Sequence, residues 1–285
     1  MNIGELNIEI VTDGLVQVDP GGPFGLVPRA LYQKYINPDE NNLIPMRLDC
    51  LLIRSAGKTI LVNSGLGDRL NDRARQYWGL TRPEGGLIEN LAKYDVSPGD
   101  VDIVLNTHLH SDHCGGNTRW EGESLVATFP NAEYWVQWTE YADASHPDAR
   151  TRGTYLDDNF APLAAQGRLR LLRGDTEVTP EVSCVMTPGH TRGHQSVVLQ
   201  SDGWRGLYPS DMATFAIHMA KAAWVTSYDV LPLENISTKE RWQRWAIEND
   251  AWIFMEHDPK HSVVQLKEEN GKVKLASVDI TESLS

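Results

Sequence analysis

Residues 105–116, LNTHLHSDHCGG, place three histidines and one aspartate within six positions after a short apolar run. His108 and His110 are two residues apart, and in an extended chain alternate side chains share one face, so both imidazoles can bind a single ion. Asp112 and His113 follow and point elsewhere, so this loop can supply ligands to two neighbouring centres. Imidazole and carboxylate together suit zinc, and also Fe, Mn or Co.

One loop cannot complete two coordination shells, so further ligands must come from other parts of the chain. Three candidates each follow a predicted strand: His190 in TPGHTRGH, Asp211 in YPSDM and His257 in FMEHD. Loops at strand ends are where a rigid scaffold displays catalytic and binding residues. Seven ligands shared between two ions leave coordination positions open, which is typical of catalytic rather than structural metal sites.

In their order along the chain, HLHSDHCGG, TPGHTRGHQS, SDM and EHD resemble the metal motifs of the metallo-β-lactamase fold superfamily. The resemblance implies an α/β fold, an αββα sandwich of two mixed β-sheets flanked by helices, with the metals at one edge. It also implies two divalent transition-metal ions, with zinc expected and Fe, Mn or Co as alternatives. The implied ligands are His108, His110 and His190 for the first ion, Asp112, His113 and His257 for the second, and Asp211 bridging both.

Within this superfamily the chain resembles the quorum-quenching lactonases and methyl parathion hydrolase. True β-lactamases generally lack a bridging carboxylate at the position of Asp211. The resemblance implies a hydrolase in which a hydroxide shared by two metals attacks a lactone or carboxylic ester. Asp112 is the candidate catalytic residue that orients this nucleophile and passes a proton to the leaving group. The alternatives are a phosphotriesterase-type hydrolase and, less favoured, a di-iron redox or sensor protein or a β-lactamase.

Two residues are expected to support the metal ligands without binding the metals. Many relatives carry Asp-Thr-Gly after the second strand of the first hairpin, whereas this chain has Asn63-Ser64-Gly65. Asparagine can hydrogen-bond a ligand imidazole but brings no charge. His194 is predicted to play a similar supporting or structural part, and Gly115 and Gly116 to let the backbone pass close to its neighbours.

The substrate contacts are expected to follow the bridging aspartate. Lactonases carry a substrate-binding tyrosine three residues beyond it, and this chain has Thr214 there, so Tyr228 or another donor would have to replace that hydroxyl. The segment 212–228 is rich in Met, Phe, Trp and Tyr, which suits either core packing or an apolar pocket wall. The predicted substrate contacts are Thr214, Phe215, His218 and Trp224.

The elements that must position these residues alternate between strands and helices. The pattern predicts a strand at 6–14, a hairpin of 46–55 with 59–62, and a buried strand that ends at the histidines. Residues 19–45, rich in Pro, Gly and Asn, are predicted to form a surface excursion that acts as a lid, a dimer arm or decoration. Later strands are predicted at 133–137, 182–187, 195–200, 205–208, 251–255, 262–267 and 273–277, with helices at 155–166 and 238–249.

Composition narrows the class of protein. The 285 residues are expected to form one domain, and the formal net charge of −13 disfavours nucleic acid and anionic membranes as partners. No apolar run approaches the length of a membrane span, and no signal peptide is recognised. The three dispersed cysteines suggest no disulfide framework. We therefore expect a cytoplasmic enzyme that acts on a small molecule, with a homodimer as one option for its assembly.

Overall fold

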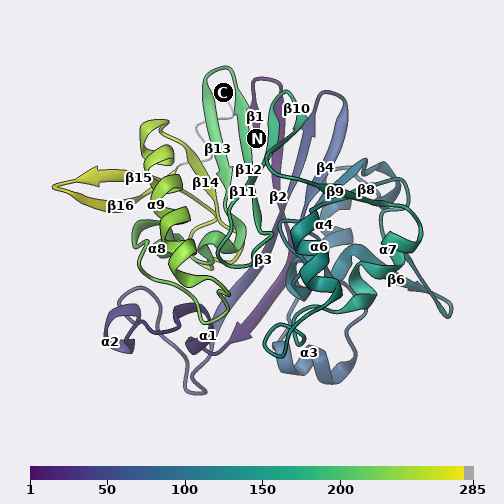
Figure 1. Ribbon diagram of the computed structural model, residues 1–285, viewed down its shortest axis with the longest axis horizontal. Helices are drawn as coiled ribbons and strands as arrows, with labels where there is room; N and C mark the ends of the chain where they lie inside the picture. Colours follow the sequence, from purple (N-terminus) through teal and green to yellow (C-terminus); the bar gives the residue numbers. More distant parts are fainter. Residues whose placement is uncertain (279–285) are drawn as a thin grey trace.

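Two seven-stranded β-sheets lie face to face in the structure, a computed structural model that describes residues 1–278 (Figure 1). Helices cover the outer face of each sheet, so the predicted αββα sandwich is confirmed. The first sheet has the strand order β1-β2-β3-β4-β5-β8-β9, and the second has the order β10 to β16. A small separate hairpin, β6 (Thr118–Glu121) with β7 (Ser124–Ala127), follows the histidine loop.

The first sheet is antiparallel from β1 to β4 and parallel from β4 onward. Because β4, β5 and β8 are parallel, their carboxyl ends meet at one edge. The strands are β1 (Asn2–Ile3), β2 (Leu6–Val18), β3 (Ile44–Ser55), β4 (Lys58–Val62), β5 (Ile103–Leu105), β8 (Glu133–Gln137) and β9 (Leu169–Leu172).

The second sheet is antiparallel except for the parallel pair β13 and β14, whose ends also reach the site edge. Its strands are β10 (Thr176–Thr179), β11 (Val182–Met186), β12 (Gln195–Ser201), β13 (Trp204–Tyr208), β14 (Trp252–Phe254), β15 (Val263–Glu269) and β16 (Lys272–Ser277).

The helices are short apart from α9. They are α1 (Gly21–Phe24), α2 (Arg29–Tyr32), α3 (Asp72–Trp78), α4 (Leu87–Ala92), α5 (Ser111–Cys114), α6 (Trp138–Ser145), α7 (Ala161–Ala165), α8 (Ala216–Ala220) and α9 (Pro232–Glu248). Four 3₁₀ turns complete the set: η1 (Pro98–Asp100), η2 (Gly115–Asn117), η3 (Asp157–Asn159) and η4 (Ser210–Ala213).

The core lies between the sheets and continues under the helices on both sides. Leu51 and Ile53 of β3 face the second sheet, whereas Leu52 of the same strand faces Leu87 and Leu91 of α4. Both faces of β3 are therefore buried, which explains its nearly continuous apolar sequence. On the other side of the molecule, α9 packs its buried residues against β13, β14 and β15.

Most predicted strands are confirmed, but two predicted helices have different bounds. The 155–166 helix is divided into η3 and α7, which has a proline in its first turn. The 238–249 helix begins at Pro232, a favourable first residue because its missing N–H would be unpaired there anyway. Thr238, predicted near the start, lies inside the helix and donates its hydroxyl to the carbonyl of Pro188 at 2.8 Å.

The 19–45 segment is not only a surface excursion. Phe24 is fully buried, and its ring stacks on Tyr32 at 4.7 Å and on Phe215 at 5.6 Å between centroids. Ile36 is buried in the same cluster, whereas Leu26 is 93 % exposed. The predicted excursion is therefore anchored by its own apolar core, and its part in a dimer stays a prediction.

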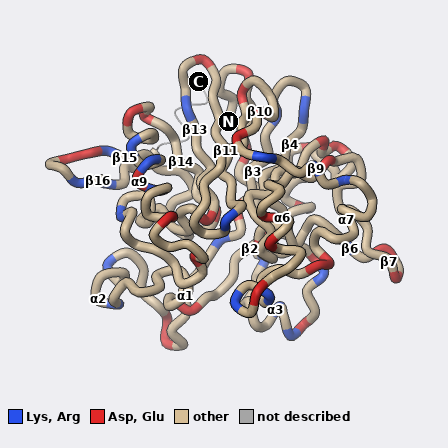
Figure 2. Tube along the Cα trace, viewed as in Figure 1, with Lys and Arg blue, Asp and Glu red and all other residues tan. Residues whose placement is uncertain are grey.

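In the described residues no helix is long and apolar enough to cross a membrane. Lys and Arg residues are spread over both halves of the trace in Figure 2 and interleave with the more numerous Asp and Glu residues. Cys50, Cys114 and Cys184 are all buried and form no disulfide, as the sequence indicates.

Phe24→Ala should destabilise the protein by about 3–5 kcal/mol, because it removes a fully buried ring and leaves a cavity. The matched control is Leu26→Ala, two residues away and almost fully exposed, which should change the free energy of unfolding by less than about 0.5 kcal/mol. Urea unfolding monitored by circular dichroism measures both. Equal effects of the two substitutions would contradict the anchoring role of Phe24.

Candidate metal centre

The seven predicted ligands come from four loops at one edge of the two sheets. The chain enters this edge at the ends of β5, β11, β13 and β14. The turn after β5 must pass close to the 63–66 loop: a Cβ on Gly116 would lie 2.2 Å from the carbonyl oxygen of Ser64, and one on Gly115 would lie 2.4 Å from that of Leu66. The predicted close approach at these glycines is confirmed, and it fixes the histidine loop against the first hairpin.

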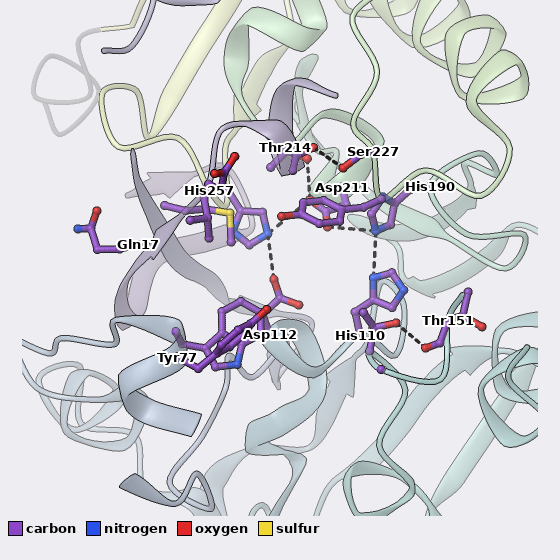
Figure 3. Close-up of a pocket in the computed structure, with 18 of the residues that line it drawn as sticks. Gln17, Tyr77, His110, Asp112, Thr151, His190, Asp211, Thr214, Ser227 and His257 are labelled. Atoms are coloured by element: carbon purple, nitrogen blue, oxygen red, sulfur yellow. Dashed lines mark hydrogen bonds and ion pairs between the residues drawn. The ribbon is translucent and has the colours of Figure 1, made fainter. Parts of the chain in front are cut away.

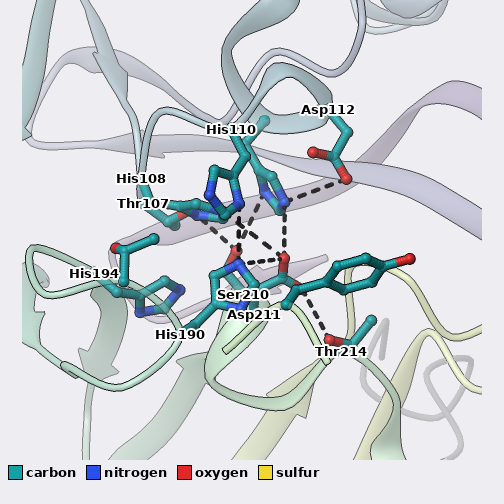
Figure 4. Close-up of polar contacts among 12 residues, drawn as sticks. Thr107, His108, His110, Asp112, His190, His194, Ser210, Asp211 and Thr214 are labelled. Carbon is teal, nitrogen blue, oxygen red and sulfur yellow. Dashed lines mark hydrogen bonds and ion pairs between the residues drawn. The ribbon is translucent and has the colours of Figure 1, made fainter. Parts of the chain in front are cut away.

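The ligands form two groups whose donor atoms lie close enough to hold a metal ion each. Figure 4 labels every residue of the first group and Asp112 of the second. The first group is His108, His110, His190 and Asp211, and the second group is Asp112, His113 and His257. This division matches the one predicted from the sequence, with Asp211 counted in the first group.

Donor atoms in the first group face one another at short range. His108 Nε2 lies 3.0 Å from His110 Nδ1, and His190 Nε2 lies 3.1 Å from the same nitrogen. Asp211 Oδ2 lies 3.2 Å from His190 Nε2. Two ligands bound to one zinc ion at about 2.0–2.1 Å in tetrahedral geometry stand about 3.3 Å apart, so these separations fit a metal site.

The second group is slightly wider and shares Asp211 with the first. His113 Nε2 and His257 Nε2 are 3.3 Å apart, and Asp112 Oδ2 lies 3.6 Å from the first of these nitrogens. Asp211 Oδ2 is 3.2 Å from His113 Nε2, and Asp211 Oδ1 is 3.4 Å from His257 Nε2. The Asp211 carboxylate thus touches both groups, as a bridging ligand must.

Outer hydrogen-bond partners fix the direction of three ligand rings. The Nδ1–H of His190 donates to Asp229 Oδ1 at 3.0 Å, and the Nδ1–H of His257 donates to the carbonyl of Arg47 at 2.7 Å. His113 Nδ1 lies 3.0 Å from Glu256 Oε1. In each case Nε2 is left to face the centre, which is how proteins orient metal-binding histidines.

The charge of the centre also fits bound cations. Among the described residues, Asp112, Asp211, Asp229 and Glu256 form ion pairs only with histidines, never with Lys or Arg. Burying carboxylates without Lys or Arg partners costs desolvation free energy, so bound cations would stabilise this set of side chains. Divalent ions with nitrogen and oxygen ligands would supply it.

The pKa values of the ligand groups shift in both directions. Burial lowers the pKa of His113, but the carboxylates of Glu256, Asp112 and Asp211 outweigh it and raise that pKa well above its ordinary value, so this ring must lose a proton when a metal binds. Burial, together with the neighbouring His113 and His110, lowers the pKa of His108 well below its ordinary value, so the ring stays neutral as a ligand requires. Burial would raise the pKa of the Asp211 carboxyl, but the facing histidines outweigh it and hold that pKa well below its usual range. The bridging group is therefore ionised.

Asn63 and His194 lie just outside the two groups, as predicted. Asn63 Nδ2 donates to Glu256 at 3.0 Å and lies 3.0 Å from His113 Nδ1. The His194 ring is 5.1 Å from that of His108, with its Nδ1 2.8 Å from the hydroxyl of Thr187. Burial and the nearby His190 lower the pKa of His194 to about 3, so it remains a neutral packing partner.

Three supporting carboxylates were not identified from the sequence. Glu140 is fully buried and accepts hydrogen bonds from Leu109 N–H at 2.9 Å and Thr191 Oγ1 at 2.6 Å, so it ties two ligand loops together. Asp229 and Glu256 hold ligand histidines. Only Glu256, directly before His257 in the EHD motif, carried a local signal that could have identified it.

The centre forms the floor of a cavity of about 680 Å³ (Figure 3). Thr214 lines it, as predicted, but its hydroxyl donates to Asp211 Oδ1 at 3.1 Å and so is already engaged. The apolar and aromatic lining comes from Val18, Leu43, Met46, Tyr77, Trp78 and Tyr228, and the polar lining opposite includes Arg150, Thr151, Thr154 and Ser227.

Three predicted substrate contacts do not reach this cavity. Phe215 and His218 are buried, and with the half-buried Trp224 they surround Phe24, whose ring centroid is 5.3 Å from that of His218 and 6.2 Å from that of Trp224. The prediction that they form pocket walls is corrected: they pack the 19–45 segment onto the second half of the molecule. The residues that do line the cavity come from strand ends, a helix and loops that are distant in sequence, so no periodic pattern marks them.

Comparison with known proteins agrees with this geometry. Residues 45–225 match the Metallo-beta-lactamase superfamily. The N-acyl homoserine lactonase AttM of Rhizobium radiobacter is 24 % identical over 189 residues, which cover 64 % of this chain and 68 % of AttM.

Solved structures share nearly the whole fold. A probable metal-dependent hydrolase from Staphylococcus aureus superposes with a TM-score of 0.87 at 29 % identity, covering 98 % of this chain and 100 % of that one. The dizinc quorum-quenching lactonase AidC superposes with a TM-score of 0.79 at 20 % identity, covering 98 % and 97 %. The chain belongs to the metallo-beta-lactamase superfamily and is a hydrolase.

His218→Asn should make the protein less sensitive to acid. Burial, then Lys239, lowers the pKa of His218 to about 3, so the folded ring stays neutral while the unfolded ring takes up a proton below pH 6.5. Stability from this group is present above pH 6.5 and is lost as the pH falls toward 3. Between pH 7 and pH 5 the loss is about 2 kcal/mol.

Denaturant unfolding of chelator-treated protein at pH 7 and pH 5 measures this difference. Asparagine can still accept the hydrogen bond that the Phe215 N–H donates to His218 Nδ1. His146→Asn, the same substitution at an exposed histidine, is the control. An equal acid loss in wild type and His218→Asn would show that this ring titrates normally.

Proposed function

We propose that the protein is a dinuclear metal-dependent hydrolase of lactones or small carboxylic esters. The observation that carries the proposal is the pair of ligand groups, joined by Asp211, at the floor of a cavity of about 680 Å³. AttM, an N-acyl homoserine lactonase, supports the reaction class. The match spans about two thirds of AttM, and the particular lactone stays open.

His108, His110 and His190 would hold one ion, Asp112, His113 and His257 the other, and Asp211 both. Two zinc ions bound there would polarise the ester carbonyl and lower the pKa of the attacking water toward neutrality. The described cysteines are all buried and are absent from both groups. The possible metal ligands are therefore imidazole nitrogens and carboxylate oxygens, without thiolate sulfur.

Asp112 is suited to handle the nucleophile. Its side chain is 13 % exposed and lines the cavity, whereas the histidines of its group are fully buried. One carboxylate oxygen can therefore face the centre while the other faces substrate. In this position Asp112 orients the attacking water, accepts its proton and returns a proton to the leaving alkoxide.

Tyr228 is the candidate for the substrate-binding hydroxyl that Thr214 does not supply. Its side chain lines the cavity. Partial burial of its ring and the carboxylates of Asp112 and Asp211 raise the pKa of Tyr228, so its hydroxyl stays protonated and can donate a hydrogen bond. A protonated donor near the two carboxylates can bind the carbonyl oxygen of an ester or lactone.

The cavity walls favour a neutral substrate with an apolar arm. Met46, Trp78 and the half-exposed Tyr228 offer apolar surface, and Asp19 at the mouth adds negative charge to an acidic chain. The acidic chain offers a carboxylated bicyclic drug no long-range attraction, and the Arg150 guanidinium in the lining already donates hydrogen bonds to the carbonyls of Ser227 and Asp229. A cytosolic location and a homodimer are part of the same proposal.

Protein purified without chelator should contain two transition-metal ions per chain by elemental analysis. Asp211→Asn should lower the metal content below two and reduce hydrolysis by more than about 100-fold, because the bridging ligand serves both ions. His194→Gln, at a buried histidine outside both groups, should retain two ions. A limit of one ion per wild-type chain, even after metal soaking, would refute the dinuclear centre.

Lactones or aryl esters should exceed a β-lactam in kcat/KM by orders of magnitude when a substrate panel is run on zinc-loaded protein. The reason is the bridging carboxylate of Asp211 and the apolar part of the cavity wall formed by Met46, Trp78 and Tyr228. The panel includes a phosphotriester, and the highest kcat/KM on that substrate would favour the phosphotriesterase alternative. A β-lactam as best substrate would contradict the reasoning from Asp211.

A further inference from the structure

We propose that Glu256 is the positioning residue for His113 and that Asn63 and Glu256 work as a matched pair of one amide and one carboxylate. The inference rests on the proposed dinuclear centre. Position 63 carries a neutral amide beside the histidine loop. Glu256 supplies negative charge next to His113 from the opposite sheet.

Glu256 lies between the two halves of the fold and is 2 % exposed. Its Oε1 is 3.0 Å from His113 Nδ1, and its Oε2 accepts a hydrogen bond from Ser210 Oγ at 2.7 Å. Asn63 Nδ2 lies 3.0 Å from both carboxylate oxygens. The carboxylate thus contacts the first hairpin, the histidine loop and the turn that carries Asp211.

The orientation of the Asn63 amide is fixed from its other side. Asn63 Oδ1 accepts hydrogen bonds from Thr107 N–H at 2.9 Å and Thr107 Oγ1 at 3.1 Å. The NH₂ group must therefore face Glu256, to which it donates. An aspartate at position 63 would instead place a second carboxylate oxygen about 3 Å from Glu256, a like-charge contact in a buried site.

Position 63 is also placed to take over the role of Glu256. Asn63 Nδ2 lies 3.0 Å from His113 Nδ1, the same distance as Glu256 Oε1. An oxygen at that place could accept the Nδ1–H of His113 directly. The site therefore offers two positions for one carboxylate, and this chain fills the one on the second sheet.

The first ligand group also contains one histidine whose Nδ1–H is held by a buried carboxylate. His190 donates its Nδ1–H to Asp229, which also accepts hydrogen bonds from Thr226 Oγ1 at 2.9 Å and Asn235 Nδ2 at 2.7 Å. Each ligand group then has one histidine backed by a carboxylate, His190 by Asp229 and His113 by Glu256. Glu256 gives the second group the charge that Asp229 gives the first.

The experiment compares wild type, Glu256→Gln, Asn63→Asp and the double variant Asn63→Asp/Glu256→Gln. Zinc content and zinc affinity are measured by competition with a chromophoric chelator, and the visible spectrum of the Co(II) form reports ligand geometry. Thermal unfolding of the metal-free proteins is recorded in parallel. Glu181→Gln, the same change at a half-buried glutamate outside the metal groups, is the control.

Glu256→Gln should weaken the binding of one of the two zinc ions by about 10- to 100-fold and alter the Co(II) spectrum, while Glu181→Gln changes neither. Asn63→Asp should lower the unfolding temperature of the metal-free protein. Combining the two substitutions should restore both quantities to near the wild-type values, because the pair again holds one carboxylate and one amide.

Unchanged zinc affinity in Glu256→Gln would overturn the positioning role. A double variant that binds zinc no better than Glu256→Gln would overturn the exchange of roles with position 63. These results are separate from the proposed function, which would fail instead if wild-type protein never binds a second ion. None of the readouts depends on which ester or lactone the enzyme hydrolyses.

Discussion

The site depends on balancing the negative charge of the four carboxylates that form ion pairs with its histidines. Asp112, Asp211, Asp229 and Glu256 face histidines and no Lys or Arg among the described residues. Two divalent ions would balance four negative charges. The loops can then be short and tightly hydrogen-bonded, because the binding energy of the ions opposes the repulsion between the carboxylates.

The scaffold meets this constraint by bringing strand ends from both sheets to one edge. The parallel arrangement of β4 with β5 and of β13 with β14 directs these strand ends to the same place. Glu140 then links the histidine loop to the His190 loop, and Tyr155 donates its hydroxyl to the same carboxylate at 2.9 Å. Buried hydrogen bonds to Glu140 therefore help to fix the ligand loops relative to each other.

The metal ligands could be predicted from the sequence because each lies in a contiguous motif directly after a strand. Asp229 could not, since its contact with His190 depends on how the chain returns before α9. The prediction for Phe215 was wrong for a related reason. An aromatic residue next to a metal ligand in the sequence can either line the substrate pocket or pack in the core, and only the buried contact with Phe24 shows that Phe215 packs in the core. The start of α9 was predicted six residues too late, although Pro232 is a favourable first residue of a helix.

Because Phe215 and Trp224 are committed to packing around Phe24, the cavity lining is left to other parts of the chain. Val18 ends β2, Tyr77 lies in α3 and Tyr228 lies in the segment before α9, and Tyr77 and Tyr228 remain exposed at 84 % and 42 %. The two exposed tyrosines can change with little effect on the core. In the proposed enzyme, the buried carboxylates and histidines would carry the reaction chemistry, and a few exposed aromatic residues around them would carry substrate preference.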